Sequence, residues 1–223
     1  MNERMINKKS VLDDFVKKFI SILEHYSIYA IVGSYVAIAQ GRTRGTEDID
    51  LFIESIDLDT YIRLHEELLK NNFECIQGDD PNFLYSFYLF NKDSIRYILK
   101  DTYGPDMELF FCKDEVAEYQ LKTRKKYPLT ELNFYFTSVE GNIAYKEFLL
   151  KFPKDMEDAR YLREVYGADL DLNEINKYKD LIKKYIYDIH SNLLKDSELE
   201  NNYVFRRDKS HLEQIIRSAK FVK

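Results

Sequence analysis

Hydrophobic positions in the first quarter of the chain change their period, and each period predicts a different element. Residues 11–25 carry apolar side chains three and four positions apart, which predicts an amphipathic helix. Residues 28–32 form a short β-branched run that ends at Gly33, and residues 34–40 favour a brief helix. Residues 48–53 alternate at first and then become apolar, as expected of a central strand whose first residues project from the core.

The middle of the chain combines one helix with a series of aromatic and β-branched segments. Residues 58–70 have helical spacing. Segments 73–76, 83–90 and 94–100 are separated by turn residues and predict a meander of strands, and residues 107–112 predict a further strand. These segments predict an α/β (α+β) protein with a mixed sheet at its core.

From about residue 138 the pattern becomes helical throughout. We therefore expect a first domain over residues 1–137, which carries the sheet, and a helical C-terminal region over residues 138–223, which completes a cleft. The segments with helical spacing are 138–151, 154–166, 173–195 and 208–221.

Composition and charge narrow the class of protein. The 223 residues are 45 % hydrophobic, which is ample for a core, yet no apolar run reaches the roughly 18 residues of a membrane span. The formal net charge of −6 argues against a protein whose whole surface coats nucleic acid. The cysteines Cys75 and Cys112 suit a reducing compartment. These features predict a globular protein of the cytoplasm without membrane association.

Two acidic residues follow a glycine–serine turn at a spacing that suggests a metal site. Because side chains alternate along a strand, Asp48 and Asp50 are expected on one face, turned toward Gly33 and Ser34. Neighbouring carboxylates repel each other and persist mainly when a divalent cation neutralises them; oxygen ligands suit Mg²⁺, which brings a triphosphate. At the turn, Gly33 lets the backbone approach a phosphate, and Ser34 offers a hydroxyl at the start of a helix.

A third acid would complete a site for two metal ions, and one predicted strand offers two candidates. Glu108 lies between the apolar Met107 and Leu109 and is the preferred one. Its alternative role is a structural ion pair with Arg96 on the preceding strand. Asp106 shares the strand face of Glu108, but it is also placed to serve the preceding turn.

These residues resemble the nucleotidyltransferase fold of the DNA polymerase β superfamily, whose pattern is an apolar strand, a Gly-Gly or Gly-Ser turn, a short helix, acid-x-acid on a strand and a later third acid. The stretch IVGSYVAIAQGRTRGTEDIDLFI is similar to the opening of the minimal and AbiEii-type bacterial and archaeal nucleotidyltransferases. The segment SVEGNIAYKEFLLKFPKDMEDARYL is similar to a later part of that group, a helix with a lysine followed by a Lys-Asp-x-x-Asp-like stretch. The resemblance extends from residue 28 to about residue 165.

The resemblance implies roles for individual residues. Glu108 would also activate the acceptor, and Lys146 would contact a phosphate or orient the acceptor. Asp155 and Asp158 match the downstream acids of the family, although both are equally suited to stabilising a helix N-terminus. The implied metal ligands are Asp48, Asp50 and Glu108, and the implied nucleotide-binding residues are Gly33, Ser34, Arg42, Arg44 and Lys146.

The activity that this resemblance implies is transfer of a nucleoside monophosphate from a nucleoside triphosphate to an acceptor hydroxyl, with two Mg²⁺ ions. The acceptor would be a small molecule such as an antibiotic, a tRNA end, or a protein side chain in a toxin–antitoxin pair, and the negative charge slightly disfavours RNA. An antitoxin or a second copy of the chain would be a protein partner. The alternative function is a catalytically inactive nucleotide-binding regulator or scaffold with the same fold.

Other polar residues favour structural roles. The four histidines lack the spacing of metal ligands. The basic run 122–126 is suited either to a nucleic-acid backbone or to a solvated surface, and we favour the surface. The histidines are His25, His65, His190 and His211.

Overall fold

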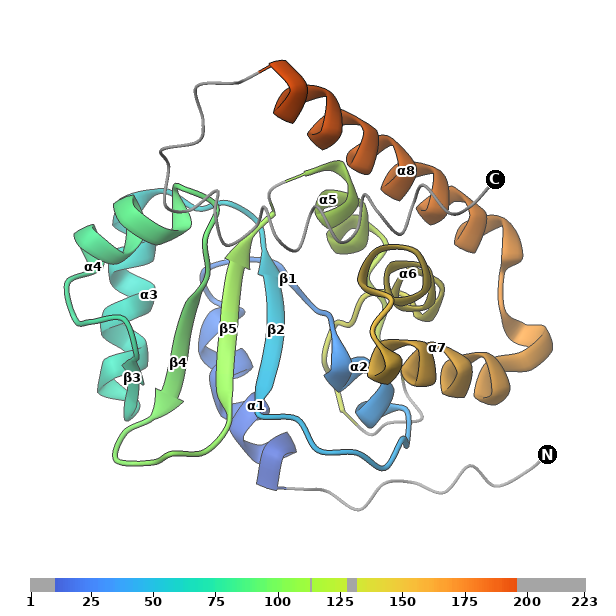
Figure 1. Ribbon diagram of the computed structural model, residues 1–223. Coiled ribbons are helices and arrows are strands. Elements are labelled where there is room, and N and C mark those ends of the chain that lie inside the picture. The colour runs from blue at the N-terminus through green and yellow to red at the C-terminus, as the bar shows by residue number, and fades with distance from the viewer. Residues whose placement is uncertain (1–10, 113, 128–131, 196–223) are drawn as a thin grey trace.

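A five-stranded mixed sheet forms the centre of the molecule (Figure 1). The computed structural model describes residues 11–112, 114–127 and 132–195, with the backbone alone for residues 190–195. The strands lie in the order β1-β2-β5-β4-β3; β2 and β5 are parallel, and the other neighbours are antiparallel. The strands are β1 (Tyr29–Ile31), β2 (Asp48–Ile53), β3 (Phe73–Cys75), β4 (Ile95–Leu99) and β5 (Asp106–Phe111).

Helices lie behind the sheet and beside it. In Figure 1, α1 lies behind the sheet, and α6, α7 and α8 form a helical layer at the side of β1 and α2. No helix of the described residues is long and apolar enough to cross a membrane. The helices are α1 (Val11–Leu23), α2 (Ser34–Ala39), α3 (Leu58–Lys70), α4 (Pro81–Phe83), α5 (Glu115–Lys122), α6 (Val139–Tyr145), α7 (Pro153–Tyr166) and α8 (Leu172–Lys195), with π-helical turns η1 (Leu84–Leu89) and η3 (Lys146–Leu150) and a 3-10 turn η4 (Gly167–Asp169).

The buried apolar side chains form two clusters. The first joins α1 and α3 to one face of the sheet, and the second joins α5, α6, α7 and α8. Helix α2 contributes to both, because Val36 packs in the first cluster and Ala37 in the second. The short helix after the glycine turn therefore lies where the sheet and the helical layer meet.

The alternation of β2 gives the sheet one apolar and one polar face at this point. Ile49, Leu51 and Ile53 are fully buried in the first cluster, whereas Asp48 and Asp50 are only partly buried on the opposite face. This is the arrangement that the sequence predicts for residues 48–53. The α+β class and the mixed sheet are confirmed.

One predicted strand is wrong, since residues 83–90 are helical. Asp80 accepts a hydrogen bond from the backbone N–H of Asn82 at 3.0 Å, and Pro81 occupies the first helical turn, so the segment starts as a capped helix. In the π-helical turn, Leu84 and Leu89 are buried five positions apart, a spacing that a strand would place on opposite faces. The aromatic content of the segment had suggested a strand.

One helix was not expected from the sequence, and two expectations stay untested. Helix α5 was not predicted, although Asp114 caps it by accepting hydrogen bonds from the N–H groups of Val116 and Ala117 at 2.9 Å. The predicted helix 208–221 lies outside the described residues. Helix α6 begins at Val139, and the division of the chain after residue 137 stays a prediction.

Candidate active site

Three carboxylates from neighbouring strands meet on the polar face of the sheet. The parallel register of β2 and β5 sets Asp50 opposite Glu108, and Asp48 opposite Asp106. One carboxylate oxygen from each of Asp48, Asp50 and Glu108 lies within 4.8 Å of the others. The structure thus brings together the three acids that the sequence singles out, and their role as metal ligands stays a prediction.

The glycine–serine turn touches this carboxylate trio, which is Asp48, Asp50 and Glu108. Gly33 has φ +69°, a conformation that glycine adopts without strain, and a Cβ at this position would collide with Oδ2 of Asp50. The N–H of Val32 donates to the carbonyl oxygen of Asp50 at 2.9 Å. Only glycine therefore allows the turn to approach the trio this closely.

The negative charge of the trio is only partly compensated by Arg96 and Lys146, which both lower the pKa of Asp50. Burial, followed by the charges of Asp48 and Glu108, raises the pKa of Asp50 to about 7. Burial is also the largest cause that raises the pKa of Asp106 to about 6. Clustered carboxylate oxygens fit a hard divalent cation such as Mg²⁺, because the cation replaces mutual repulsion by attraction.

Glu108 is also held by two side chains of the segment that leads into β4. The Ser94 hydroxyl donates to Oε1 of Glu108 at 2.6 Å, and Arg96 Nη2 donates to Oε2 at 2.9 Å. Glu108 therefore forms the ion pair with Arg96 and also lies in the trio, and its role as a metal ligand stays a prediction. Arg96 Nη1 also lies 4.0 Å from Asp106. Ser94 was not found by sequence reasoning, because its partner lies 14 residues away on the neighbouring strand β5.

The Ser34 hydroxyl is held in place by a second hydroxyl. It lies 3.0 Å from Oγ1 of Thr46, which in turn donates to Oδ1 of Asp48 at 3.0 Å. The turn and the trio thus share a hydrogen-bonded chain through Ser34, Thr46 and Asp48. Thr46 was also missed, although its position two residues before Asp48 is the one signal that the sequence offers.

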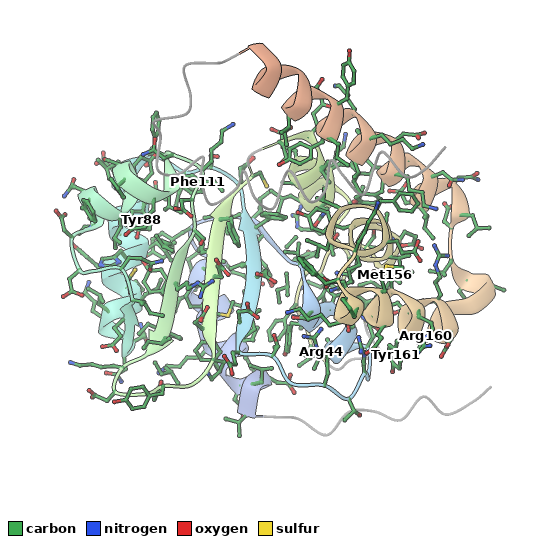
Figure 2. The ribbon with its side chains drawn as sticks, in the orientation of Figure 1. Arg44, Tyr88, Phe111, Met156, Arg160 and Tyr161 are labelled. Atoms are coloured by element: carbon green, nitrogen blue, oxygen red, sulfur yellow. The ribbon has the colours of Figure 1, made fainter. Side chains whose placement is uncertain are left out.

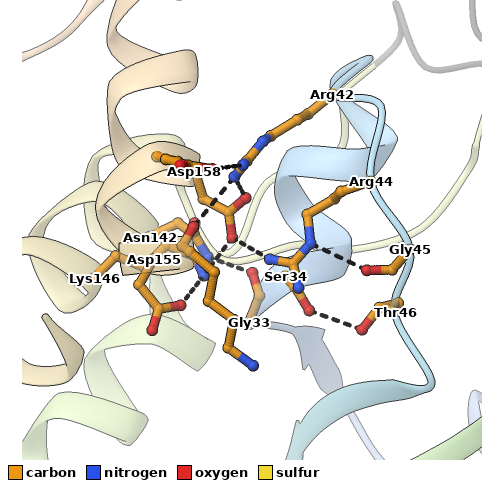
Figure 3. A network of polar contacts seen from close by, with 12 residues as sticks. Gly33, Ser34, Arg42, Arg44, Gly45, Thr46, Asn142, Lys146, Asp155 and Asp158 are labelled. Atoms are coloured by element: carbon orange, nitrogen blue, oxygen red, sulfur yellow. Dashed lines mark hydrogen bonds and ion pairs between the residues drawn. The ribbon is translucent and has the colours of Figure 1, made fainter. Parts of the chain in front are cut away.

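A buried network of ion pairs lies next to the turn (Figure 3). Asp158 of α7 is fully buried and pairs with Arg42, with Arg44 Nη1 at 2.7 Å and with Lys146 Nζ at 2.9 Å. Lys146 Nζ also donates to Asp155 at 2.8 Å. Asp155 and Asp158 therefore neutralise buried cations and do more than stabilise the start of α7. The contacts of Arg42 and Arg44 with a phosphate stay predictions.

Lys146 connects this network with the carboxylate trio. It is 1 % exposed and stands where α6 passes into the π-helical turn η3, a local widening that is frequent at functional sites. Burial lowers the pKa of its ammonium group, while the hydrogen bond with Asp155 and the charge of Asp50 oppose that effect. The charge of Lys146 in turn lowers the pKa of Asp50.

The loop between α2 and β2 is fastened to α7 by further contacts. Arg42 Nη2 donates to Glu157 at 2.8 Å, and the Tyr161 hydroxyl donates to the carbonyl oxygen of Gln40 at 3.1 Å. Figure 2 shows Arg44 and Tyr161 close to α7, at the side of the sheet opposite to Tyr88. The loop that carries both arginines is therefore held by the helical layer.

The side chain of Asn142 was not found by sequence reasoning. It projects from α6, and its Nδ2 donates to the carbonyl oxygen of Gly33 at 2.9 Å (Figure 3). The two residues are 109 positions apart. The only signal in the sequence is that Asn142 precedes Lys146 by one helical turn.

The histidines and the basic run 122–126 lie outside the carboxylate trio and the ion-pair network. His65 is buried, with Nδ1 2.8 Å from the Tyr97 hydroxyl, and His25 is exposed. In the basic run, Lys125 pairs with Glu140 at 3.7 Å and is itself about half exposed. The side chain of His190, and His211, lie outside the described residues.

Comparison with known proteins identifies the fold. No family profile matches the chain, and no curated protein matches it. The solution structure of the antibiotic-resistance factor ANT(2'')-Ia is similar with a TM-score of 0.53 at 14 % identity, covering 82 % of this chain and 97 % of that one. A crystal structure of ANT(2'')-Ia in complex with adenylyl-2''-tobramycin has a TM-score of 0.52 at 15 % identity, covering 79 % and 99 %.

At such low identity the likeness concerns the fold alone. The mixed sheet with its surrounding helices is the nucleotidyltransferase fold that the sequence predicts. The finer resemblance to AbiEii-type proteins stays a prediction.

Proposed function

We propose that this protein is a Mg²⁺-dependent nucleotidyltransferase, which moves a nucleoside monophosphate from a nucleoside triphosphate to an acceptor hydroxyl. The observation that carries the proposal is the carboxylate trio in contact with a glycine–serine turn, in a nucleotidyltransferase fold. A structural role does not account for three acids gathered where one of them has a pKa of about 7, because their repulsion opposes folding.

In this proposal the carboxylate trio holds the metal ions, and the glycine–serine turn holds the triphosphate. Asp48, Asp50 and Glu108 would hold two Mg²⁺ ions, which supply positive charge to the triphosphate and to the attacking oxygen. Gly33 admits the triphosphate because it has no side chain, and the Ser34 hydroxyl donates to a phosphate oxygen. Glu108, fixed by Ser94 and Arg96, takes the proton of the acceptor hydroxyl.

The network places three cationic side chains, Arg42, Arg44 and Lys146, next to the turn. Lys146 is placed by Asp155 and Asp158, and its ammonium group lies close enough to Asp50 to lower the pKa of that carboxyl. We propose that Lys146 and Arg44 stabilise negative charge on the triphosphate, with Arg42 holding the loop.

A small hydroxylated molecule is the acceptor class that we propose first. The similar ANT(2'')-Ia was crystallised with adenylyl-2''-tobramycin, a nucleotide joined to a small molecule. A tRNA end and a protein side chain in a toxin–antitoxin pair are the other classes to screen. An adenylyl complex of that neighbour makes ATP the first donor to test.

Thermal unfolding with nucleotides tests the site directly. Wild-type protein, Asp50→Asn and the control Asp59→Asn, an exposed acid of α3, are heated with ATP, GTP, CTP or UTP, with and without Mg²⁺. A nucleotide at about 100 times its dissociation constant adds roughly 2.7 kcal/mol to the stability of the folded state. We expect a Mg²⁺-dependent stabilisation in the wild type and in Asp59→Asn, and none in Asp50→Asn.

A second experiment, the transfer of labelled nucleotide to candidate acceptors, separates the proposal from its rival. An inactive nucleotide-binding scaffold would be stabilised by nucleotide but would transfer no label to any acceptor, even in a screen over antibiotics, tRNA and proteins. Stabilisation of Asp50→Asn equal to that of the wild type would refute the site. Transfer of labelled nucleotide by the wild type, lost in Asp50→Asn, would establish the activity.

A further inference from the structure

The carbonyl group of Gly33 is held by a side chain from the helical layer. Asn142 is 3 % exposed, and its Nδ2 donates to the Gly33 carbonyl oxygen at 2.9 Å. The position of Asn142 is fixed by its own helix: Ser138 caps α6, and a Cβ on Gly141 would lie 2.6 Å from the ring of Tyr178. Ile143 is fully buried in the second apolar cluster. The carboxamide therefore approaches the turn from a rigid support.

The other end of the same carboxamide has no hydrogen-bond partner among the described residues. Oδ1 of Asn142 is buried and unpaired. Burying an amide oxygen without a partner is unfavourable, and most buried polar atoms avoid it. An apolar residue at this position would avoid that cost. The presence of Asn142 therefore indicates that the hydrogen bond from its Nδ2 to Gly33 is functionally important.

The bond to Gly33 controls the direction of a second group. The peptide unit is planar, so the Gly33 carbonyl and the Ser34 N–H rotate together as one rigid plate. Glycine gives this plate unusual freedom, because the plate turns about ψ of Gly33, which is −145° here, and no Cβ restricts that rotation. A hydrogen bond on the carbonyl oxygen therefore also fixes where the Ser34 N–H points.

We infer that Asn142 is a positioning residue for the triphosphate: it holds the Gly33–Ser34 peptide so that the Ser34 N–H is directed toward a phosphate oxygen before the nucleotide arrives. This inference rests on the proposed function, since a nucleoside triphosphate is the ligand. By this inference an uncharged side chain of α6, 109 residues away in sequence, contributes to nucleotide affinity.

Two substitutions of Asn142 and a control on the same helix test the inference. Asn142→Ala removes the donor, and Asn142→Asp replaces it by an oxygen that repels the Gly33 carbonyl. The control Ile143→Ala loses a buried side chain of the second cluster and destabilises α6 without touching the turn. The dissociation constant of MgATP, and kcat and KM where an acceptor is found, are measured well below the unfolding temperature of each variant.

We expect Asn142→Ala to weaken MgATP binding by about three- to tenfold, the range of one lost hydrogen bond, with KM raised and kcat nearly unchanged. Asn142→Asp should weaken it further. Ile143→Ala should lower the melting temperature and leave the affinity at the wild-type value. Wild-type affinity in Asn142→Ala would overturn the inference.

Hydrogen exchange of the Ser34 amide separates a failure of this inference from a failure of the proposed function. Faster exchange in Asn142→Ala than in both the wild type and Ile143→Ala supports the positioning role, even if the wild type binds no nucleotide. Unchanged exchange overturns it. Should Asn142→Ala fail to fold, Asn142→Ser provides the same comparison with a polar side chain too short to reach Gly33.

Discussion

At the scale of single residues, burial and then the charges of Asp48 and Glu108 make the ionised form of Asp50 unfavourable in the folded protein. Its folded-state pKa of about 7 lies above the value of 3.8 for an ordinary aspartate. Between these pH values the folded state binds more protons than the unfolded state, so the free energy of unfolding falls as pH rises. Above pH 7 the full penalty is present.

We expect Asp50→Asn to be more stable than the wild type at pH 8 without metal, by on the order of 2–4 kcal/mol, because it removes this penalty. The difference should disappear near pH 4, where Asp50 is protonated in the wild type. Urea unfolding of both proteins in EDTA at pH 4 and pH 8 measures it. Equal stabilities at pH 8 would contradict the prediction, and added Mg²⁺ should favour the wild type alone.

The geometry of the turn does not tolerate a side chain at Gly33. Gly33→Ala imposes a strained φ of +69° and a collision with Asp50, so we expect a loss of at least 1–3 kcal/mol of stability and no nucleotide-induced stabilisation. Gly45→Ala is the matched control, because its Cβ would have no neighbour within 4 Å. Thermal unfolding of both variants measures the loss of stability. A Gly33→Ala protein as stable as the wild type would contradict the described geometry of the turn.

Individual site residues were predictable where the pattern was local. Asp48 and Asp50 follow from strand alternation alone, and their approach to Gly33 follows from the order of strand, turn and strand. Asn142 and Ser94 were not predictable, because their partners are 109 and 14 residues away and neither carries a charge that would draw attention.

At the scale of elements, α7 holds the α2–β2 loop through one buried carboxylate. Asp158 forms ion pairs with Arg42, Arg44 and Lys146. Removing its charge therefore leaves these three cations with too few partners. We expect Asp158→Asn to lose about 3–5 kcal/mol. Glu157→Gln, an exposed neighbour on the same helix, should stay within about 0.5 kcal/mol of the wild type. Denaturant unfolding compares them; equal losses would show that Asp158 is not the central partner.

Elements were predictable where polar capping residues and apolar periodicity agreed. Helix α3 shows both signals: Asp57 caps its N-terminus, and its apolar residues lie on one face with polar residues on the other. Residues 83–90 show the opposite case: aromatic composition favoured a strand, and the capping signal of Asp80 and Pro81 prevailed. Capping acts on the first turn of the backbone, so it outweighs a weak side-chain preference.

At the scale of the whole molecule, the two apolar clusters share helix α2. Val36 belongs to the cluster under the sheet, and Ala37 belongs to the cluster of the helical layer. Together with the ion pairs of Asp158, this sharing couples the sheet to the helices. We therefore expect the chain before residue 138 and the chain after it to unfold together.

We expect a single cooperative unfolding transition. Far-ultraviolet circular dichroism reports the helices and tyrosine fluorescence reports side-chain packing, so their urea transitions should coincide. Separate midpoints would show that the region after residue 137 unfolds as an independent domain. Asp158→Asn, which loosens the coupling, should be the variant in which the two probes first diverge.

The long sequence separation between Gly33 and Asn142 also has a consequence for the order of events during synthesis. A growing chain emerges from its N-terminus, so the turn and all three acids are present long before α6 and α7. Until residues 142–158 have been translated, the Gly33 carbonyl lacks Asn142 as its donor, and the two arginines lack Asp158 as their partner. An unfinished chain would carry the carboxylate trio before the helices that support the turn are present, so the proposed activity would begin only after most of the protein has been made.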